Sequence, residues 1–235
     1  MSITKLEDVR KEDVATVGGK AANLGELIGI GMPVPDGFVV TDQQNLGEIG
    51  FHFLSTDFAR VAVRSSGIAE DGAKASMAGQ HDTYLDVFCS PKFVIPAIRK
   101  CFESANNPRA IAYREENGIT EDRIAVIVQR MIDPLYSGVL FTADPVDGDT
   151  SRFVVEYVEG TGEKLVSGEV IPFSFDMSRH SIQWEDVGEQ EFHTPTLHAY
   201  ASEIDHHFGC PQDIEWCVDK EYKLWILQAR PITTL

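Results

Sequence analysis

The chain has 235 residues, with 20 Lys and Arg against 37 Asp and Glu, so its net charge is −17. This acidic balance argues against nucleic acid or an anionic membrane as the general partner, because both attract positively charged surfaces. Apolar residues make up 43% of the chain and charged residues 24%, which is ordinary for a globular protein and excludes a disordered one.

The sequence predicts neither a targeting segment nor a cysteine-based metal or disulfide site. No apolar run approaches the ~18 residues that a membrane span needs, and the charged N-terminus lacks the apolar core of a signal peptide. The four cysteines form no CxxC pair, which disfavours both a zinc site and a disulfide framework. We therefore expect a cytoplasmic protein with reduced thiols.

The first half of the chain mixes helices with short strands. A helix is predicted from Lys20 to about Ile30, because its apolar residues recur at helical spacing and Gly31 and Pro33 end it. Further elements are expected in chain order: a strand at 38–41, a strand at 61–63, a small-residue loop at 67–80, and helices at about 91–105 and 108–118.

The second half contains more strands. The predicted elements are strands at 124–128, 138–142 and 153–158, a polar hairpin at 180–192, a helix at 194–208, and final strands at 213–218 and 223–230. Strands that alternate with turns and helices in this way predict an α+β fold with mostly antiparallel sheets. A boundary between two lobes is expected near 119–123.

The last two strands gather polar side chains on one face. A four-residue loop at 219–222 places Asp213 opposite Gln228. Because side chains alternate along a strand, one face then holds Asp213, Glu215, Gln228 and Arg230. The apolar face holds Ile214, Trp216, Val218, Trp225 and Leu227. Oxygen ligands of this kind suit Mg²⁺ with phosphate oxygens completing its shell. From the strands alone, a solvated face with a surface ion pair is the alternative.

Two segments in the first half could bind an anion. Gly18, Gly19 and Lys20 precede a helix, where free N–H groups and the helix dipole attract negative charge, although no Walker A pattern is present. The alternative is a capped helix with a surface lysine. Arg64 ends a strand just before the small-residue loop, whose backbone could approach phosphate closely. The alternative there is an ordinary surface loop.

Eight segments together indicate a family. They are GGKAANLGEL, VPDGFVVT, VAVRSSGIAEDGAKASMAGQHDTYLDV, RAIAYREENGI, IAVIVQRMI, SGVLFTADPVDGD, EGTGEKLVSGEVIP and DIEWCVDKEYKLWILQARPIT. In this order, from about Val17 to Thr234, they resemble the N-terminal ATP-binding domain of the PEP-utilising dikinases. That family includes phosphoenolpyruvate synthase, pyruvate phosphate dikinase and rifampicin phosphotransferase. The resemblance implies an ATP-grasp-like fold that clamps ATP between two lobes, here residues 1–120 and 121–235.

The resemblance also implies roles for cationic and loop residues. Lys20 and Arg64 match the phosphate-binding cations of the family, and Arg230 matches the arginine over the transferring phosphates. These three side chains form the implied catalytic set. Gly79 and Thr83 match the loop that closes on the phosphates.

The implied metal and base-binding residues lie in the second half. Glu215 and Gln228 match the ligands of Mg²⁺ and phosphate, with Asp213 as a supporting carboxylate. Gln129 and Met131 match the segment that lines the adenine slot. The implied cofactors are therefore ATP and Mg²⁺.

The implied activity is transfer of phosphate from MgATP to a histidine on a separate swivelling domain, in the same chain or another one. The sequence contains no segment that resembles the swivelling domain, so the domain is expected to be incomplete as an enzyme on its own. The stretches 42–60 and 176–196 look shorter than in the family, which predicts a reduced N-terminal lobe. The alternatives are the ATP domain of a rifampicin-phosphotransferase-like enzyme and a stand-alone nucleotide-binding or regulatory module without turnover.

Overall fold

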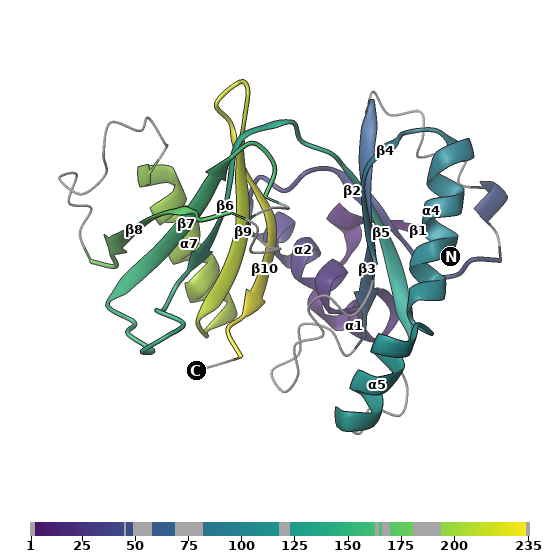
Figure 1. Cartoon of the computed structure of the whole chain (residues 1–235), viewed down its shortest axis with the longest axis horizontal. Helices are drawn as coiled ribbons and strands as arrows, with labels where there is room; N and C mark the ends of the chain where they lie inside the picture. Colours follow the sequence, from purple (N-terminus) through teal and green to yellow (C-terminus); the bar gives the residue numbers. More distant parts are fainter. Residues whose placement is uncertain are drawn as a thin grey trace. The chain divides into compact units, whose positions relative to one another are not determined.

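The chain forms two compact units, each built on its own sheet (Figure 1). The computed structural model describes residues 3–44, 46–48, 58–68, 82–117, 123–162, 165, 170–180 and 194–233. Unit 1 comprises Met1–Ile30 and Pro35–Met131, and unit 2 comprises Gly31–Val34 and Ile132–Leu235. The division after Met131 falls later than the boundary expected near 119–123, because the strand at 124–130 pairs with two strands of unit 1.

Unit 1 contains a five-stranded antiparallel sheet in the order β1-β2-β5-β3-β4. Its strands are β1 (Ile3–Lys5), β2 (Gly37–Val40), β3 (Arg60–Gly67), β4 (Thr83–Phe88) and β5 (Ile124–Arg130). Its helices are α1 (Val14–Val17), α2 (Gly19–Gly29), α4 (Pro91–Ser104) and α5 (Pro108–Asn117), with 3₁₀ turns at Leu6–Asp8, Lys11–Asp13 and Leu46–Glu48.

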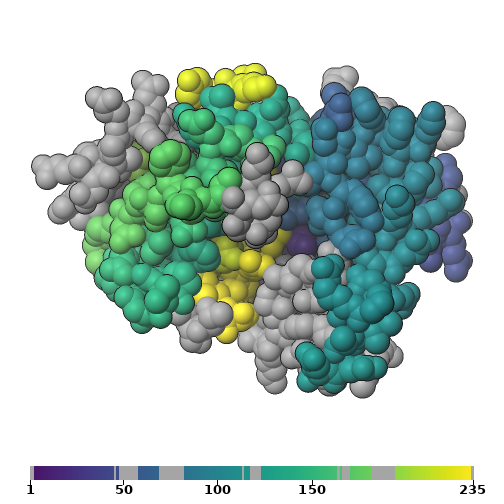
Figure 2. All heavy atoms as spheres, in the orientation of Figure 1, coloured from purple at the N-terminus to yellow at the C-terminus, as the bar shows by residue number. Residues whose placement is uncertain are grey.

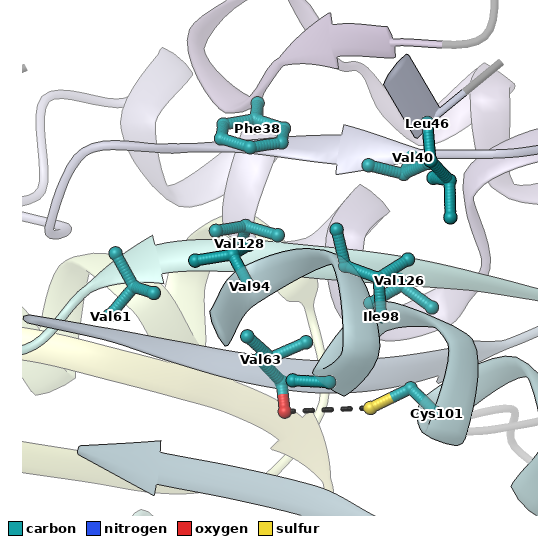
Figure 3. Close-up of a cluster of buried hydrophobic side chains, with 11 residues drawn as sticks. Phe38, Val40, Leu46, Val61, Val63, Val94, Ile98, Cys101, Val126 and Val128 are labelled. Carbon is teal, nitrogen blue, oxygen red and sulfur yellow. Dashed lines mark hydrogen bonds between the residues drawn. The ribbon is translucent and has the colours of Figure 1, made fainter. Parts of the chain in front are cut away.

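The core of unit 1 lies between α4 and one face of this sheet (Figure 3). Alternate residues of β3 and β5, such as Val63 and Val126, point toward Val94 and Ile98 of the helix. Each fully buried side chain of this type stabilises the fold by about 1.5–3 kcal/mol. Cys101 belongs to the same cluster; its Sγ donates to the carbonyl of Val63, and burial raises the pKa of its thiol to about 12. This thiol is therefore a neutral core group.

Unit 2 contains a second antiparallel sheet in the order β10-β9-β6-β7-β8 (Figure 1). Its elements are β6 (Pro134–Phe141), β7 (Arg152–Glu159), β8 (Phe173–Ser178), α7 (Thr194–Phe208), β9 (Gln212–Asp219) and β10 (Leu224–Pro231). Helix α7 packs on one face of the sheet, where His198 contacts the ring of Phe153. The helix buries Leu197, Ala201 and Ile204 at the helical spacing found in the sequence.

Charge is distributed unequally between the two units. Unit 1 has 14 Lys and Arg against 18 Asp and Glu, a net charge of −4. Unit 2 has six Lys and Arg against 19 Asp and Glu, a net charge of −13. The acidity of the chain is thus mainly a property of unit 2.

The predicted helices and most predicted strands are present, and the sequence pattern missed the edge strands β1, β4 and β8. Edge strands pair on one side only, so alternation in them is weakly enforced. The predicted hairpin at 180–192 lies almost wholly outside the described residues. In the described parts of the chain, no helix is both long and apolar enough to cross a membrane.

Candidate functional site

The N-terminus of α2 is fitted closely onto β3 in unit 1. Gly18 has φ 79° and ψ 166°, a conformation that is open essentially to glycine alone. A Cβ at this position would lie 2.2 Å from the carbonyl oxygen of Ser66. The Oγ of Ser66 in turn accepts a hydrogen bond from the backbone N–H of Ala21 at 3.0 Å. The glycine is therefore needed for the approach of the helix to the strand.

Two predicted phosphate-binding cations lie at this contact. Lys20 is buried, and its Nζ donates to the carbonyl oxygen of Ser65 at 3.3 Å. Arg64 precedes Ser65 on β3, so its backbone adjoins the residue whose carbonyl binds Lys20. Arg64 lies on the face of the sheet opposite the Val63 core side, because side chains alternate along the strand. The alternative of an exposed surface lysine is wrong, since Lys20 is only 7% exposed.

Two more predicted residues share the sheet face of Arg64. Thr83 is the cross-strand partner of Arg64 on β4, and Gln129 pairs with Ala62 on β5. Directly paired residues project from the same face. Gln129 is buried, and its amide Nε2 donates to the carbonyl of Pro35 at 3.0 Å, which ties the start of β2 to β5.

Met131 and Gly79 are the other residues of this unit that the sequence singled out. Met131 follows β5, and its backbone N–H is bonded to the carbonyl of Arg60 at 3.0 Å. Gly79 lies outside the described residues.

In unit 2, the turn between β9 and β10 differs from the predicted four-residue loop. Leu224 pairs with Val218, so the loop spans five residues, 219–223. Asp219 closes this loop: its Oδ1 accepts the backbone N–H groups of Glu221 and Lys223, and its Oδ2 accepts the indole N–H of Trp225 at 2.7 Å. Residues 220–223 of this loop are exposed, and the loop corresponds to the yellow atoms at the top of Figure 2.

A β-bulge in β10 shifts the pairing a second time. Ile226 is opposite Trp216, but Gln228 is opposite Glu215, so Leu227 is an extra residue in the ladder. The predicted pairing of Asp213 with Gln228 is therefore wrong by two residues. The longer loop and the bulge each shift the register by one residue, and two such shifts restore the original alternation.

The predicted polar face is consequently present. Gln228 pairs with Glu215 and Arg230 pairs with Asp213, so all four side chains project from one face. Two members of the predicted apolar face are misplaced, because the register between the loop and the bulge is shifted by one residue. Trp225 pairs with Cys217 on the carboxylate side.

A small apolar cluster surrounds Trp225 on the carboxylate side of the hairpin. Trp225, Cys217 and Ile132 are buried together, and Leu227 packs against them. Leu227 thus also lies outside the predicted apolar face. The residues that do share the Trp216 face of the hairpin are Ile214, Val218, Leu224, Ile226 and Ala229.

One carboxylate oxygen of Asp213 is hydrogen-bonded to Arg230, and the other accepts no hydrogen bond from the described residues. Nε and Nη2 of Arg230 both donate to Oδ2 of Asp213, at 2.9 and 2.7 Å. Oδ1 of the same carboxylate is buried and has no hydrogen-bond partner among the described residues. Burial raises the pKa of the Asp213 carboxyl, the nearby Arg230 charge lowers it in part, and Glu215 raises it again.

This donor set fits a hard divalent cation. A buried, orphaned carboxylate oxygen lies on the face that also holds Glu215 and Gln228, and all three groups offer oxygen. Mg²⁺ in phosphate-binding sites is usually held by one or two carboxylates together with phosphates and waters. Among the described residues, no group of three or more His, Cys, Asp or Glu is arranged to hold a metal ion by itself.

Comparison with protein families decides the assignment. The family described as "Pyruvate phosphate dikinase, AMP/ATP-binding domain" matches residues 45–194 and 186–235. The chain belongs to this family. The family resemblance noted in the sequence is thereby confirmed.

Curated relatives of the domain are longer proteins. A probable phosphoenolpyruvate synthase of Archaeoglobus fulgidus is 32% identical over 100% of this chain and 42% of the relative. A rifampicin phosphotransferase of Bacillus cereus is 31% identical over 99% of this chain and 36% of the relative. The chain thus spans less than half the length of these relatives.

Solved structures support the fold. The D-alanine-D-alanine ligase of Helicobacter pylori has a TM-score of 0.52 at 10% identity, covering 93% of this chain and 55% of the ligase. The corresponding ligase of Coxiella burnetii has a TM-score of 0.51 at 11% identity, covering 95% and 49%. With the two antiparallel sheets, these similarities confirm the predicted α+β, ATP-grasp-like architecture.

Proposed function

We propose that this domain binds MgATP and passes phosphate to a histidine on a separate domain or chain, as the ATP-binding part of a phosphoenolpyruvate-synthase-like dikinase. The observation that supports this most strongly is the sheet face in unit 2 that gathers Asp213, Glu215, Gln228 and Arg230. Phosphoryl transfer requires positioning and charge neutralisation more than covalent help from the protein. A face with oxygen ligands for a cation and one arginine for phosphate supplies both.

Unit 1 would contribute direct phosphate contacts. Lys20, held at the start of α2, and Arg64 on β3 would bind phosphate oxygens, and Thr83 lies on the same sheet face as Arg64. The role of Gly79 in closing over the phosphates rests on its sequence match. Gln129 would act through its bond to the carbonyl of Pro35, which orders the backbone that leads into the adenine-lining segment.

The end of β5 and the metal ligands complete the assignment. Met131 would line the adenine slot. Glu215 and Gln228 would hold Mg²⁺, which neutralises phosphate charge, and the free Oδ1 of Asp213 would support it. Arg230, oriented by the other oxygen of Asp213, would stabilise the charge of the transferring phosphate.

The group that accepts the phosphate would lie in a part of a longer protein that this chain does not include. The relatives contain more than twice the sequence matched here, and two relatives with different names match this chain at nearly the same identity. ATP use is therefore the part of the reaction proposed for this domain, and the identity of the acceptor would be set outside it.

Intact-mass analysis after incubation with MgATP at neutral to alkaline pH tests the proposal, because phosphohistidine survives under these conditions. The chain alone should gain no phosphate, whereas the part of the Archaeoglobus relative that this chain does not cover, supplied in trans, should gain one on a histidine. The Lys20→Ala variant should abolish this gain. If the isolated chain phosphorylates one of its own histidines and passes the phosphate to pyruvate, the proposal is wrong. ATP binding without transfer to any supplied domain would favour a regulatory module.

A further inference from the structure

We propose that Glu156 is a further carboxylate of the metal- and phosphate-binding face and sets how strongly nucleotide binding depends on Mg²⁺. This inference rests on the proposed function, because it concerns the same sheet face. Nothing in the sequence motifs assigned a role to Glu156.

Glu156 lies in the middle of a strand whose alternate residues are core residues. Phe153, Val155 and Tyr157 are buried, and Phe153 contacts His198 of α7. Because neighbouring residues in a strand project to opposite faces, Glu156 projects from the face away from α7. A carboxylate at this position does not serve the packing of the helix against the sheet.

The strand register places Glu156 in line with the predicted metal ligands. Gln228 pairs with Glu215, Glu215 pairs with Val139, and Val139 pairs with Glu156. The pairing is regular between these positions of β6, β7 and β9, so all four side chains project from one face. One continuous row across four strands therefore contains two glutamates, one amide and one valine.

The spacing of this row suits a shared cation. Neighbouring strands lie about 4.8 Å apart, so the backbones of Glu215 and Glu156 are separated by roughly 10 Å. Val139 between them is shorter than either glutamate, so both carboxylates extend beyond it. Two such carboxylates can hold opposite sides of a hydrated divalent cation, whose own oxygen ligands lie at about 2.0–2.1 Å. The protein does not need to supply every ligand of the cation, because phosphate oxygens of the nucleotide complete its coordination shell.

Among the described residues, the Glu156 carboxylate has no bonded partner of opposite charge. In the described part of the chain, no hydrogen bond or ion pair joins its side chain to another residue. The cation of its own strand on this face, Arg152, is engaged by Asp144 at 2.6 Å and Asp147 at 3.2 Å. Arg230 is engaged by Asp213. Glu156 therefore adds negative charge that repels bare triphosphate and attracts a divalent cation.

The Glu156→Gln variant should change ATP binding in opposite directions without and with Mg²⁺. Without metal, ATP should bind as well as to wild type or a few-fold more tightly, because a repulsive charge is removed. With metal, the Mg²⁺ concentration that half-saturates ATP binding should rise by on the order of 10-fold, the scale of lost outer-sphere support for a metal. A variant that merely disturbed the fold would weaken binding under both conditions.

Calorimetric titration of ATP in EDTA and at a series of free Mg²⁺ concentrations measures both effects, with Mn²⁺ binding followed by electron paramagnetic resonance as a second readout. Glu159→Gln is the matched control, because it removes the same charge from the same strand on the opposite face. Glu156→Asp should restore part of the Mg²⁺ dependence.

Two outcomes separate failure of this inference from failure of the proposed function. If Glu215→Gln raises the Mg²⁺ requirement and Glu156→Gln leaves both conditions unchanged, or weakens them equally, the inference is wrong while the proposed function stands. If wild type binds no ATP at any Mg²⁺ concentration, the proposed function itself fails.

Discussion

The two units carry different charged groups at the positions proposed to bind phosphate. In unit 1, Lys20 is buried at a helix start and held by a backbone carbonyl of β3. In unit 2, the corresponding face is made of carboxylates and one arginine, positioned by strand register and a bulge. The net charge is −4 in unit 1 and −13 in unit 2, which agrees with this difference. This difference agrees with the proposal that unit 1 binds phosphate directly and unit 2 binds it through a divalent cation.

The largest effect expected in this comparison concerns the backbone of unit 1. Gly18→Ala should lower the free energy of unfolding by about 3–5 kcal/mol, because it combines a glycine-only conformation with a Cβ 2.2 Å from a backbone oxygen. Gly31→Ala is the control: its φ is +82°, but nothing lies within 4 Å of the added Cβ, so about 1 kcal/mol is expected. Urea unfolding followed by circular dichroism measures both, and equal losses would show that the helix start is not fixed by this contact.

The second largest effect distinguishes direct binding of phosphate by unit 1 from binding through Mg²⁺. Lys20→Ala should weaken ATP binding by about 1.5–3 kcal/mol, the scale of a charge-assisted hydrogen bond, both with Mg²⁺ and in EDTA. Lys11→Ala, which removes the charge of an exposed lysine in the same unit, should leave the affinity unchanged. A loss confined to the Mg²⁺ condition would contradict the role assigned to unit 1.

Glu215→Gln should show the complementary pattern in unit 2. The amide lacks the charge that a carboxylate supplies to Mg²⁺, so ATP affinity in Mg²⁺ should fall by on the order of 10-fold and affinity in EDTA should not fall. Glu221→Gln in the β9–β10 loop removes an exposed charge from the same hairpin and serves as the control. Equal losses under both conditions would show that Glu215 does not bind the metal.

The smallest effect tests the buried carboxylate. Because burial raises the pKa of Asp213 in the folded state, the folded protein binds this proton more tightly than the unfolded chain does. Wild type therefore loses stability as pH rises from the ordinary pKa of 3.8 through the raised value, and Asp213→Asn lacks this loss. The variant should gain stability relative to wild type across this acidic range in urea unfolding. A relative loss with rising pH would indicate that the pairing with Arg230 outweighs burial.

Sequence alternation predicted the composition of the polar face and could not predict its pairing. The side of the sheet depends only on whether a register shift is even or odd. The five-residue loop closed by Asp219 and the extra residue Leu227 are two odd shifts that cancel for Gln228 and Arg230. They do not cancel for Trp225, which lies between them and therefore projects from the other face.

Other features could not be predicted from local sequence, because they depend on residues that are distant in sequence and close in space. The glycines before α2 indicated an anion site, but the reason for Gly18 is the carbonyl of Ser66, which is 48 residues away in sequence. Glu156 was missed because its place opposite Val139 depends on strand order, although the alternation of Phe153, Val155 and Tyr157 could have identified it as an outward carboxylate. The periodic helices α2, α4 and α7 needed no such information.

Isothermal titration of the wild-type chain with ATP, in parallel with Mg²⁺ and with EDTA, tests the central claim most directly. We expect saturable binding with Mg²⁺ at or below millimolar ATP and a clearly weaker, still measurable affinity in EDTA through the cations of unit 1. Absence of binding at millimolar ATP in Mg²⁺, or equal affinity in the two conditions, would contradict it.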